Sequence, residues 1–353
     1  MSKFNKIYRS RAPLRLSFGG GGTDVDPYAR NHGGMVINAT IDMHSHAILE
    51  ISENKKITFI ASDLGKEKVF DSTSEIPVDN VLRIHCEVYN TIVRDFLNGD
   101  PLSFTLTTFS DAMPGSGLGT SSTMVVTILK VFDEWLKLDL SDYQLADLAY
   151  KIEREYLGIA GGKQDQYSAV FGGFNFMEFG PGDRVLVNPL RLKKEIIMEL
   201  ESYLVLYSTG RSRDSGKIIE EQKNNLNQKH TDVQYYNNLK QYSVEIKESF
   251  LRGDYLKFAC LINQSWNAKK ELAKNVTNSK IDNLYDFALL NGAIAGKISG
   301  AGGGGMFMFV VRPENKLQLI SKLNSLKGQG QVERFHFSRF GVESWAYLKN
   351  ILG

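Results

Sequence analysis

The residues of this chain best suited to chemistry lie in one short segment, residues 114–122, which reads PGSGLGTSS. Seven of these nine residues are small, so a ligand can approach the backbone closely. The segment follows a predicted strand over residues 102–107 and opens a predicted amphipathic helix over residues 120–137. Because free N–H groups and the macrodipole at a helix N-terminus attract anions, the pattern predicts a loop that binds phosphates.

All nine loop residues are candidates for holding the phosphates of a nucleotide: Pro114, Gly115, Ser116, Gly117, Leu118, Gly119, Thr120, Ser121 and Ser122. The Ser121 hydroxyl is also a candidate ligand of a magnesium ion that bridges the phosphates. The alternative interpretation is an ordinary helix, capped by Ser or Thr, after a tight turn.

Two better-known phosphate signatures do not fit. Gly296 and Lys297 are followed by Ile298 and lack the leading glycine of a P-loop. Residues 300–305 satisfy G-x-G-x-x-G, but a predicted strand over residues 306–311 follows them where a dinucleotide-binding motif has a helix. The sequence therefore excludes a Walker-type NTPase and a Rossmann cofactor site.

Two acidic residues are placed to complete a phosphoryl-transfer site, which needs a second metal ligand and a carboxylate near the attacking hydroxyl. Glu153 lies late in a helix predicted over residues 142–157, and Asp165 follows a Gly161-Gly162 break. We interpret Glu153 as a magnesium ligand and Asp165 as the group that accepts the hydroxyl proton or orients the hydroxyl. Either residue alone could instead be a solvated surface charge.

The N-terminal segment 11–24 (RAPLRLSFGGGGTD) combines a predicted strand, a glycine turn and a polar end. Arg15 is a candidate for balancing charge on the transferred phosphoryl group, and Thr23 and Asp24 are candidates for binding sugar hydroxyls. The alternative is an edge strand with a surface arginine. His44 and His46 share one face of a predicted strand, but the sequence offers no third metal ligand nearby.

The predicted elements position these segments at three clusters that hold twelve of the 32 glycines: residues 19–22, residues 115–119 and residues 300–305. Strands are predicted over residues 35–41, 47–51, 57–61, 102–107, 174–179, 203–208, 293–299, 306–311 and, at an edge, 332–337. Helices are predicted over residues 120–137, 142–157, much of 214–290 and 313–326. A change in composition near residue 190 suggests two domains, residues 1–190 and 191–353.

Composition bounds the functional classes. At roughly 150 residues per domain, 353 residues suggest two globular domains. A net charge of +2 offers no basic face for nucleic acid, and two distant cysteines support neither disulfides nor a zinc site. The sequence shows no secretion signal or apolar span, so we expect a cytoplasmic protein without a membrane partner. Oligomeric state cannot be read from the sequence, and a homo-oligomer remains open.

The three glycine-rich segments together resemble the motifs of the GHMP kinases. Ala12-Pro13 with Arg15 and the Thr-Asp pair resembles the first motif, residues 114–121 the phosphate loop, and residues 297–305 (KISGAGGGG) the C-terminal motif. This resemblance implies an α+β protein with an N-terminal ATP-binding domain like domain 2 of ribosomal protein S5 and a ferredoxin-like C-terminal domain. It also implies that ATP and Mg²⁺ bind between them.

The resemblance assigns roles residue by residue. Ser121 and Glu153 match magnesium ligands, Asp165 the catalytic aspartate, Arg15 a basic residue near the reacting hydroxyl, and Asp24 a sugar-binding aspartate. Four glycines from the first and third motifs are added as substrate-binding candidates: Gly21, Gly22, Gly302 and Gly303.

Departures from the family pattern narrow the expected substrate. Gly21 and Gly22 stand where galactokinase-like members carry an acid and a histidine, which argues against galactose. The form FGGGGTD is similar to the branch that acts on heptose 7-phosphates and, more distantly, on fucose. The resemblance thus implies phosphorylation of the anomeric hydroxyl of a heptose 7-phosphate, for nucleotide-activated heptose and surface polysaccharide. Candidate cations for the substrate phosphate are Lys163, Arg211 and Arg213.

Two alternatives remain. Within the same family, the chain could be a hexose or fucose 1-kinase. In a different class, it could be a catalytically silent sugar-binding sensor that keeps the fold. Retention of Asp165, Glu153 and Ser121 favours catalysis, because a sensor needs neither the metal nor the proton acceptor.

Overall fold

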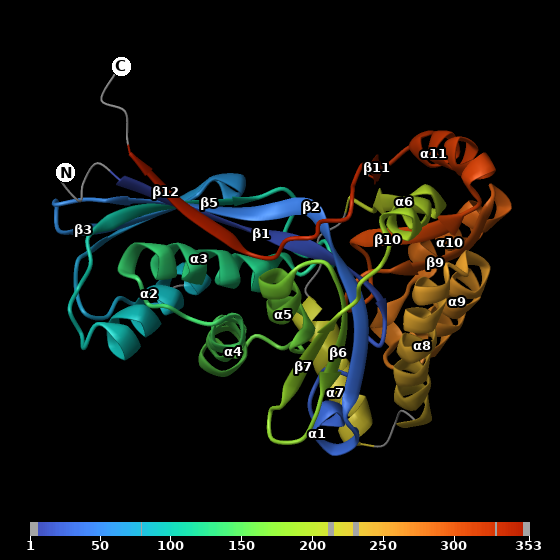
Figure 1. Ribbon diagram of the computed structural model, residues 1–353, viewed down its shortest axis with the longest axis horizontal. Helices are drawn as coiled ribbons and strands as arrows, with labels where there is room; N and C mark the ends of the chain where they lie inside the picture. The colour runs from blue at the N-terminus through green and yellow to red at the C-terminus, as the bar shows by residue number, and fades with distance from the viewer. Residues whose placement is uncertain (1–5, 79, 211–214, 229–232, 329, 349–353) are drawn as a thin grey trace.

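The protein is described by a computed structural model that covers residues 6–348, except residues 79, 211–214, 229–232 and 329. Within these residues it contains an eight-stranded sheet and a four-stranded sheet, both packed against helices (Figure 1). Helices and antiparallel-rich sheets occur together in both parts of the chain, as an α+β protein requires.

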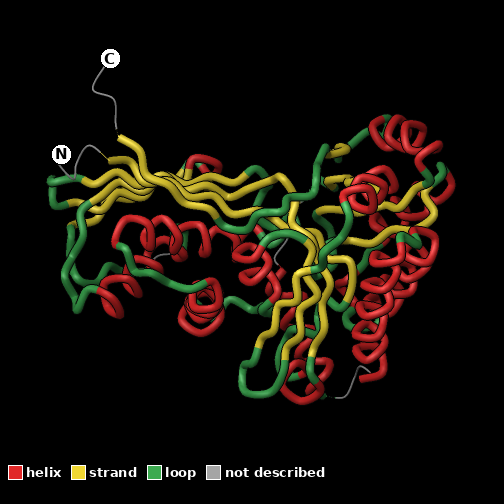
Figure 2. Tube along the Cα trace, in the orientation of Figure 1, coloured by secondary structure: helices red, strands yellow, loops and turns green. Residues whose placement is uncertain are grey.

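Two long paired strands, β1 (Lys6–Gly19) and β2 (Gly34–Ile51), form the spine of the larger sheet. β2 pairs with β6 (Phe174–Phe179) along its first half and with β5 (Phe104–Ser110) along its second half. The sheet therefore turns a corner along β2, which Figure 2 shows as a change in strand direction. The remaining strands of this sheet are β3 (Lys56–Ala61), β4 (Lys66–Asp71), β7 (Val185–Pro189) and β12 (Glu343–Leu348).

Register shifts in β1 place a functional side chain. The pairing of β1 with β2 shifts between Pro13 and Arg15 and again between Ser17 and Gly19. Proline has no N–H to donate to the ladder, so an irregularity at Pro13 is expected. Bulges can re-aim side chains, and this irregularity lies directly before Arg15, which pairs again with Thr40.

Four helices cover one face of the larger sheet: α2 (Arg83–Phe96), α3 (Thr120–Leu136), α4 (Asp142–Tyr150) and α5 (Gln164–Phe171) (Figure 1). The central helix α3 buries Val125, Ile128, Leu129 and Phe132 completely. Their helical spacing forms one apolar stripe, which packs in the same core as Phe104 of β5. This packing fixes the position of the helix whose first turn carries the predicted loop hydroxyls.

The smaller sheet has the order β11-β8-β10-β9, formed by β8 (Leu204–Ser208), β9 (Ala293–Ile298), β10 (Met306–Val311) and β11 (Gln331–Glu333). Every residue of β10 is buried because alternate side chains enter two different cores. Met306 and Met308 pack with residues of α6 (Lys194–Tyr203) and α8 (Val233–Arg252). Phe307 and Phe309 pack instead with residues of α10 (Ser279–Leu290) and α11 (Lys316–Asn324). The same core that holds Met306 includes Phe18 of β1, so apolar packing joins the two sheets.

The helices of the second half and the short helical turns complete the fold. Their bounds are α1 (Tyr28–His32), α6 (Lys194–Tyr203), α7 (Ser215–Asn227), α8 (Val233–Arg252), α9 (Tyr255–Lys270), α10 (Ser279–Leu290) and α11 (Lys316–Asn324). The short turns are η2 (Ser62–Leu64), η3 (Lys151–Tyr156), η4 (Lys274–Val276) and η5 (Pro313–Asn315).

The structure differs from the sequence predictions in several elements. The two strands predicted over residues 35–41 and 47–51 are one continuous strand, β2. The edge strand predicted over residues 332–337 is reduced to β11, with an isolated bridge between Ile41 and Phe337 beyond it. Helix α2 and strand β12 have no counterpart among the predicted elements.

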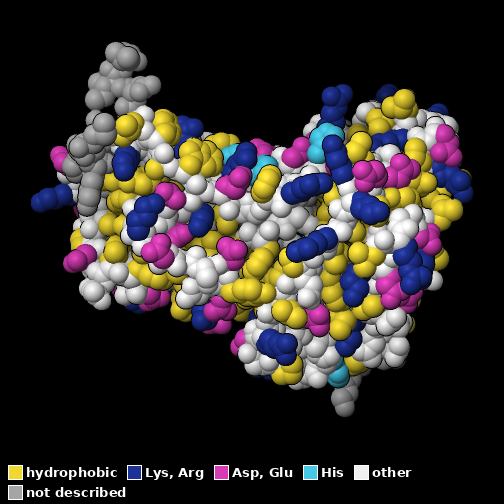
Figure 3. All heavy atoms as spheres, in the orientation of Figure 1, with side chains coloured by type: hydrophobic (Ala, Val, Ile, Leu, Met, Phe, Trp, Pro, Cys, Tyr) yellow, Lys and Arg dark blue, Asp and Glu magenta, His cyan; other side chains and the backbone are white. Residues whose placement is uncertain are grey.

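Two global properties agree with the composition. On the face shown in Figure 3, basic and acidic side chains are interspersed, as a net charge of +2 suggests. None of the helices in the described residues combines the length and apolar character needed to cross a membrane.

Candidate active site

One cleft collects most of the residues that the sequence analysis singled out. The predicted residues in its lining are Arg15, Gly22, Asp24, Gly115, Gly117, Gly119, Thr120, Ser121, Ser122, Glu153 and Asp165. Gly300 and Ala301, from the loop between β9 and β10, also line it. The three glycine-rich segments therefore meet in space although they are far apart in the chain.

The loop before α3 presents the start of that helix to the cleft. Gly119 is the N-cap residue, with a φ of 80°, a conformation that residues with a Cβ rarely adopt. It contributes no side-chain cap, so the first N–H groups of α3 stay available for an anion. A Cβ on Gly119 would also lie 3.3 Å from Oδ2 of Asp165. The glycine thus lets the catalytic candidate approach the phosphate loop.

The third glycine-rich segment, residues 300–305, packs against this loop. The N–H of Met306 donates to the carbonyl of Ser116 at 2.7 Å, and a Cβ on Gly305 would collide with Ser116. Gly302 and Gly303 pack instead against Val276, and neither lines the cleft. The structure therefore places these two glycines outside this cleft, with their backbone packed against Val276.

Lys297 of the same motif is also structural. Its side chain is 2% exposed and its ammonium donates to the carbonyl of Phe18 at 3.0 Å, which ties β9 to β1. Burial lowers the pKa of Lys297 well below its usual value, with further contributions from Lys269 and Arg15.

Arg15 and Asp165 form a fixed ion pair in the cleft. Nε and Nη2 of Arg15 lie 2.8 and 2.7 Å from Oδ1 of Asp165. Nη1 of Arg15 donates to the carbonyl of Gly117 at 2.6 Å and to the hydroxyl of Ser299 at 3.2 Å. The Arg15 side chain is almost fully buried. Four contacts, made to Asp165, Gly117 and Ser299, hold the orientation of its guanidinium. Among the described residues this leaves Oδ2 of Asp165, on the side of Gly119, for a ligand.

Ser121 and Glu153 form a second pair at the start of α3. The Ser121 hydroxyl donates to Oε1 of Glu153 at 2.7 Å, and Nε2 of Gln166 donates to Oε2 at 2.7 Å. Arg154 lies 3.3 Å from the same carboxylate, which is 1% exposed. Glu153 sits in η3, a π-helical turn that continues α4 where the sequence predicted regular helix. Such turns often occur at functional sites because they re-aim a side chain.

Asp24 is held at the opposite side of the cleft by backbone groups. The N–H of Gly22 donates to Oδ1 at 3.0 Å and the N–H of Gln164 donates to Oδ2 at 3.2 Å. A Cβ on Gly162 would collide with this carboxylate, so the Gly161-Gly162 break makes room for it. Burial raises the pKa of Asp24, and the nearby charge of Asp165 raises it further.

Two other residues of the first motif have backbone roles. Thr23 is fully buried, and its hydroxyl donates to the carbonyl of Gly20 at 2.7 Å and accepts from the N–H of Met35 at 3.1 Å. It therefore shapes the turn and does not face the cleft. Gly21 contributes its carbonyl, which accepts a bond from Lys269 at 3.3 Å.

Lys163, one of the three cations expected to hold a substrate phosphate, is not brought to the cleft. Lys163 binds Oδ1 of Asp183 at 2.6 Å and lies over the ring of Tyr150, away from the cleft lining. The physical reason is that it precedes α5 on the side of the β6–β7 connection, which supplies the partner carboxylate. Arg211 and Arg213 lie outside the described residues.

Five polar residues of the cleft were missed by the sequence analysis: Arg154, Gln164, Ser215, Gln222 and Lys269. Oε1 of Gln164 is buried and has no hydrogen-bond partner among the described residues. Lys269 is 4% exposed and donates to the carbonyl of Gly300 at 2.7 Å. No motif surrounds Gln222 or Lys269, which lie on ordinary-looking helices, whereas adjacency to Asp165 was an available signal for Gln164.

A second pocket adjoins the other side of the loop. It shares Pro114, Thr120 and Ser121 with the loop and is otherwise lined largely by apolar groups, including Leu82 and Met124. A partly apolar pocket next to a helix N-terminus, where negative charge is favoured, would suit a flat base joined to a phosphate chain.

Two protein-family models match the chain, one in each half of the sequence. Residues 83–173 match the GHMP kinases N terminal domain, and residues 246–327 match the GHMP kinases C terminal domain.

Three relatives show how specific the similarity is. The chain is 45% identical over 340 residues to D-glycero-alpha-D-manno-heptose 7-phosphate kinase of Campylobacter jejuni, covering 96% of this chain and 99% of that protein. A crystal structure of a D-glycero-D-manno-heptose 1-phosphate kinase from Bacteroides thetaiotaomicron matches with a TM-score of 0.82 at 42% identity, covering 96% and 98% of the two chains. The bifunctional fucokinase/GDP-fucose pyrophosphorylase of Arabidopsis thaliana is 24% identical over 92% of this chain and 32% of its own length.

Proposed function

The chain belongs to the GHMP kinase family, and we propose that it transfers the γ-phosphoryl group of ATP to the anomeric hydroxyl of D-glycero-D-manno-heptose 7-phosphate, giving the 1,7-bisphosphate. A heptose phosphate kinase activity is supported by two relatives at 45% and 42% identity over nearly the whole chain. The first relative is named as a heptose 7-phosphate kinase, whereas the second is named as a heptose 1-phosphate kinase. The observation that carries the proposal is the meeting of the phosphate loop, the Ser121–Glu153 pair and Asp165 in one cleft.

The nucleotide would bind across the start of α3. Its phosphates would accept from the loop and first-turn N–H groups, where the helix macrodipole favours negative charge. The base would enter the apolar pocket that contains Leu82 and Met124, because this pocket shares Thr120 and Ser121 with the loop.

The Ser121–Glu153 pair would hold Mg²⁺. A hydroxyl and a carboxylate oxygen are the hard donors that this ion prefers, and the two atoms lie 2.7 Å apart. When bound, the ion would offset charge on the phosphates and favour departure of ADP. Gln166 and Arg154 would keep the Glu153 carboxylate aimed at the loop.

Asp165 would accept the proton of the acceptor hydroxyl or orient it. The hydroxyl oxygen forms a bond to the γ-phosphorus, the bond to the β-phosphate oxygen breaks in line, and the proton passes to the carboxylate. Oδ1 of Asp165 is occupied by Arg15, so Oδ2, beside Gly119, is the oxygen available for this contact. Arg15, fixed by Gly117 and Ser299, would offset the charge that develops on the transferred group.

The sugar would occupy the side of the cleft with Gly22 and Asp24. Gln164 offers a buried acceptor that has no hydrogen-bond partner in the part of the chain that the structure describes, and Gln222 and Lys269 add an amide and an ammonium group from two further helices. We assign the substrate phosphate to Lys269, because it is the lysine of the described residues that lines this cleft. Arg211 and Arg213 remain proposed contributors.

An acceptor panel tests this function. The protein is incubated with ATP, Mg²⁺ and one of five acceptors, namely heptose 7-phosphate, heptose 1-phosphate, galactose, fucose or mannose, and ADP is measured. We expect ADP with heptose 7-phosphate above all. Turnover of fucose or a hexose alone would move the assignment to the neighbouring sugar 1-kinases. Sugar binding without ADP from any acceptor would support the sensor alternative.

A further inference from the structure

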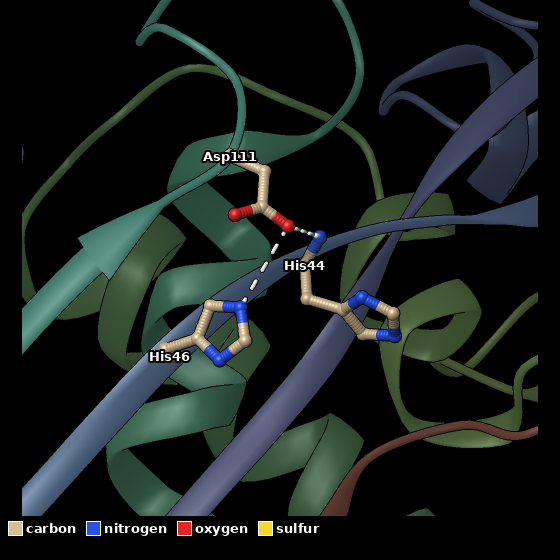
Figure 4. Close-up of side chains that lie close together, drawn as sticks. All are labelled: His44, His46 and Asp111. Atoms are coloured by element: carbon tan, nitrogen blue, oxygen red, sulfur yellow. Dashed lines mark hydrogen bonds and ion pairs between the residues drawn. The ribbon is translucent and has the colours of Figure 1, made fainter. Parts of the chain in front are cut away.

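Three potential metal ligands lie together outside the cleft. His44 and His46 are on β2, and Asp111 follows directly after β5. One ligand atom from each residue lies within 4.8 Å of the other two (Figure 4). The third ligand that the sequence could not offer is therefore supplied by a neighbouring strand.

Pairing of β2 with β5 brings these residues together. Side chains two apart on a strand share one face, so His44 and His46 point the same way. Ser45 pairs with Ser110, which sets Asp111 opposite His44. The N–H of His44 donates to Oδ2 of Asp111 at 2.8 Å, and the N–H of Asp111 donates to the carbonyl of His44 at 2.9 Å. These two bonds fix the carboxylate beside both rings.

Both rings can supply a nitrogen. Nε2 of His46 lies 3.7 Å from Oδ2 of Asp111, and the His46 ring is held by stacking on Phe109 at a centroid distance of 4.5 Å. The rings of His44 and His46 are 5.9 Å apart between centroids and tilted by 54°.

We propose that His44, His46 and Asp111 form a binding site for Zn²⁺ or a similar divalent metal ion. Two imidazoles and a carboxylate suit Zn²⁺, Co²⁺ or Ni²⁺, whereas Mg²⁺ prefers oxygen donors only. Ligand atoms in a tetrahedral zinc site lie about 3.3 Å apart, given bonds of about 2.0–2.1 Å. The His46–Asp111 pair is already close to this spacing, and rotation of the partly exposed His44 side chain would complete it.

The position of the site gives the ion a structural role. Asp111 lies three residues before Pro114, where the phosphate loop begins. A bound ion would hold the end of β5 and the start of this loop against β2. The proposal does not rest on the kinase assignment, because its ligands lie outside the cleft.

Metal binding to the full chain, without an affinity tag, tests the site. Zn²⁺ is titrated calorimetrically in excess Mg²⁺, which fills sites made of oxygen donors, and Co²⁺ is followed by its visible absorption. We expect one ion per chain, an absorption band typical of Co²⁺ with nitrogen ligands, and a raised melting temperature. His46→Ala and Asp111→Asn should each weaken binding by roughly tenfold or more.

His336→Ala is the matched control, because Nδ1 of His336 also lies 3.1 Å from a carboxylate, that of Glu201. Among the described residues, however, His336 belongs to no group of three potential metal ligands. It should leave Zn²⁺ affinity unchanged. Melting curves of the metal-free variants check that each one folds, and His44→Gln provides a second, milder disruption. Absence of binding, or binding that His44→Gln, His46→Ala and Asp111→Asn all leave intact, would overturn the proposal.

Discussion

The two sides of the cleft are built in different ways. The nucleotide side is one continuous segment, residues 114–122, backed by Glu153. The acceptor side collects single side chains from distant elements, namely Asp24, Gln164 of α5, Gln222 of α7 and Lys269 of α9. A site made from backbone groups is local in the sequence, whereas a site made from side chains is dispersed. The acceptor side can therefore change its substrate without disturbing the phosphate loop.

The largest effect is expected at Asp165, which lies between the two sides. Asp165→Asn keeps the shape of the side chain but removes the proton acceptor and the charge that pairs with Arg15. We expect kcat to fall by about 10²–10⁴ while ATP binding is retained. Steady-state kinetics and nucleotide titration separate these effects. An unchanged kcat would show that Asp165 takes no part in the reaction.

The next effect isolates the nucleotide side. Glu153→Gln removes the carboxylate charge that would hold Mg²⁺, although an amide can still accept from Ser121. We expect kcat to fall roughly a hundredfold, about 3 kcal/mol of transition-state stabilisation, and the Mg²⁺ concentration for half-maximal rate to rise. The KM for the sugar should stay within about twofold. An unaltered Mg²⁺ dependence would contradict the assigned metal ligands.

A smaller effect isolates the acceptor side. Gln164→Ala removes a buried acceptor that has no protein partner among the described residues. We expect the KM for heptose phosphate to rise roughly tenfold, about 1.4 kcal/mol, with the KM for ATP unchanged. Lys163→Met is the matched control, because the adjacent lysine points to Asp183 and should leave both KM values as they are. If Lys163→Met raised the KM for heptose phosphate more than Gln164→Ala does, Lys163 would again be assigned to the substrate site.

At His85, which lines the proposed base pocket on the nucleotide side, the expected effect is on stability and not on turnover. Burial lowers the pKa of His85 to about 4, so the folded protein keeps it neutral where the unfolded chain, with a pKa near 6.5, takes up a proton. Stability should therefore fall as the pH drops from 6.5 toward 4, by about 3 kcal/mol in total from this group.

Urea unfolding at pH 7 and pH 5 measures this contribution. His85→Gln should lose about 2 kcal/mol less than the natural protein over that interval. Equal losses in the two proteins would show that His85 is not the buried group that resists protonation.

The sequence predicted the parts of the fold and site that depend on local pattern. The stripe from Val125 to Phe132 identified α3, and the glycines before it indicated a tight loop at its N-terminus. The return of β12 to pair with β1 could not be seen, because it depends on contacts across the whole chain. The domain division near residue 190 stays a proposal.

Some predicted site residues lie outside the cleft because their residue types have several common uses. Glycine can serve a ligand or close packing, and Gly302 and Gly303 serve packing against Val276. A lysine can bind substrate or a nearby carboxylate, and Lys163 binds Asp183. Only the tertiary structure distinguishes these uses, and it also brings Ser121 beside Glu153 and Arg15 beside Asp165.

The position of the new phosphate on the product tests the central proposal most directly. The reaction of ATP and Mg²⁺ with heptose 7-phosphate is followed by phosphorus NMR. We predict a second sugar phosphorus signal coupled to the anomeric proton, as the 1,7-bisphosphate requires, appearing together with ADP. A new phosphate at another carbon, or intact heptose 7-phosphate beside unconsumed ATP, would contradict the account.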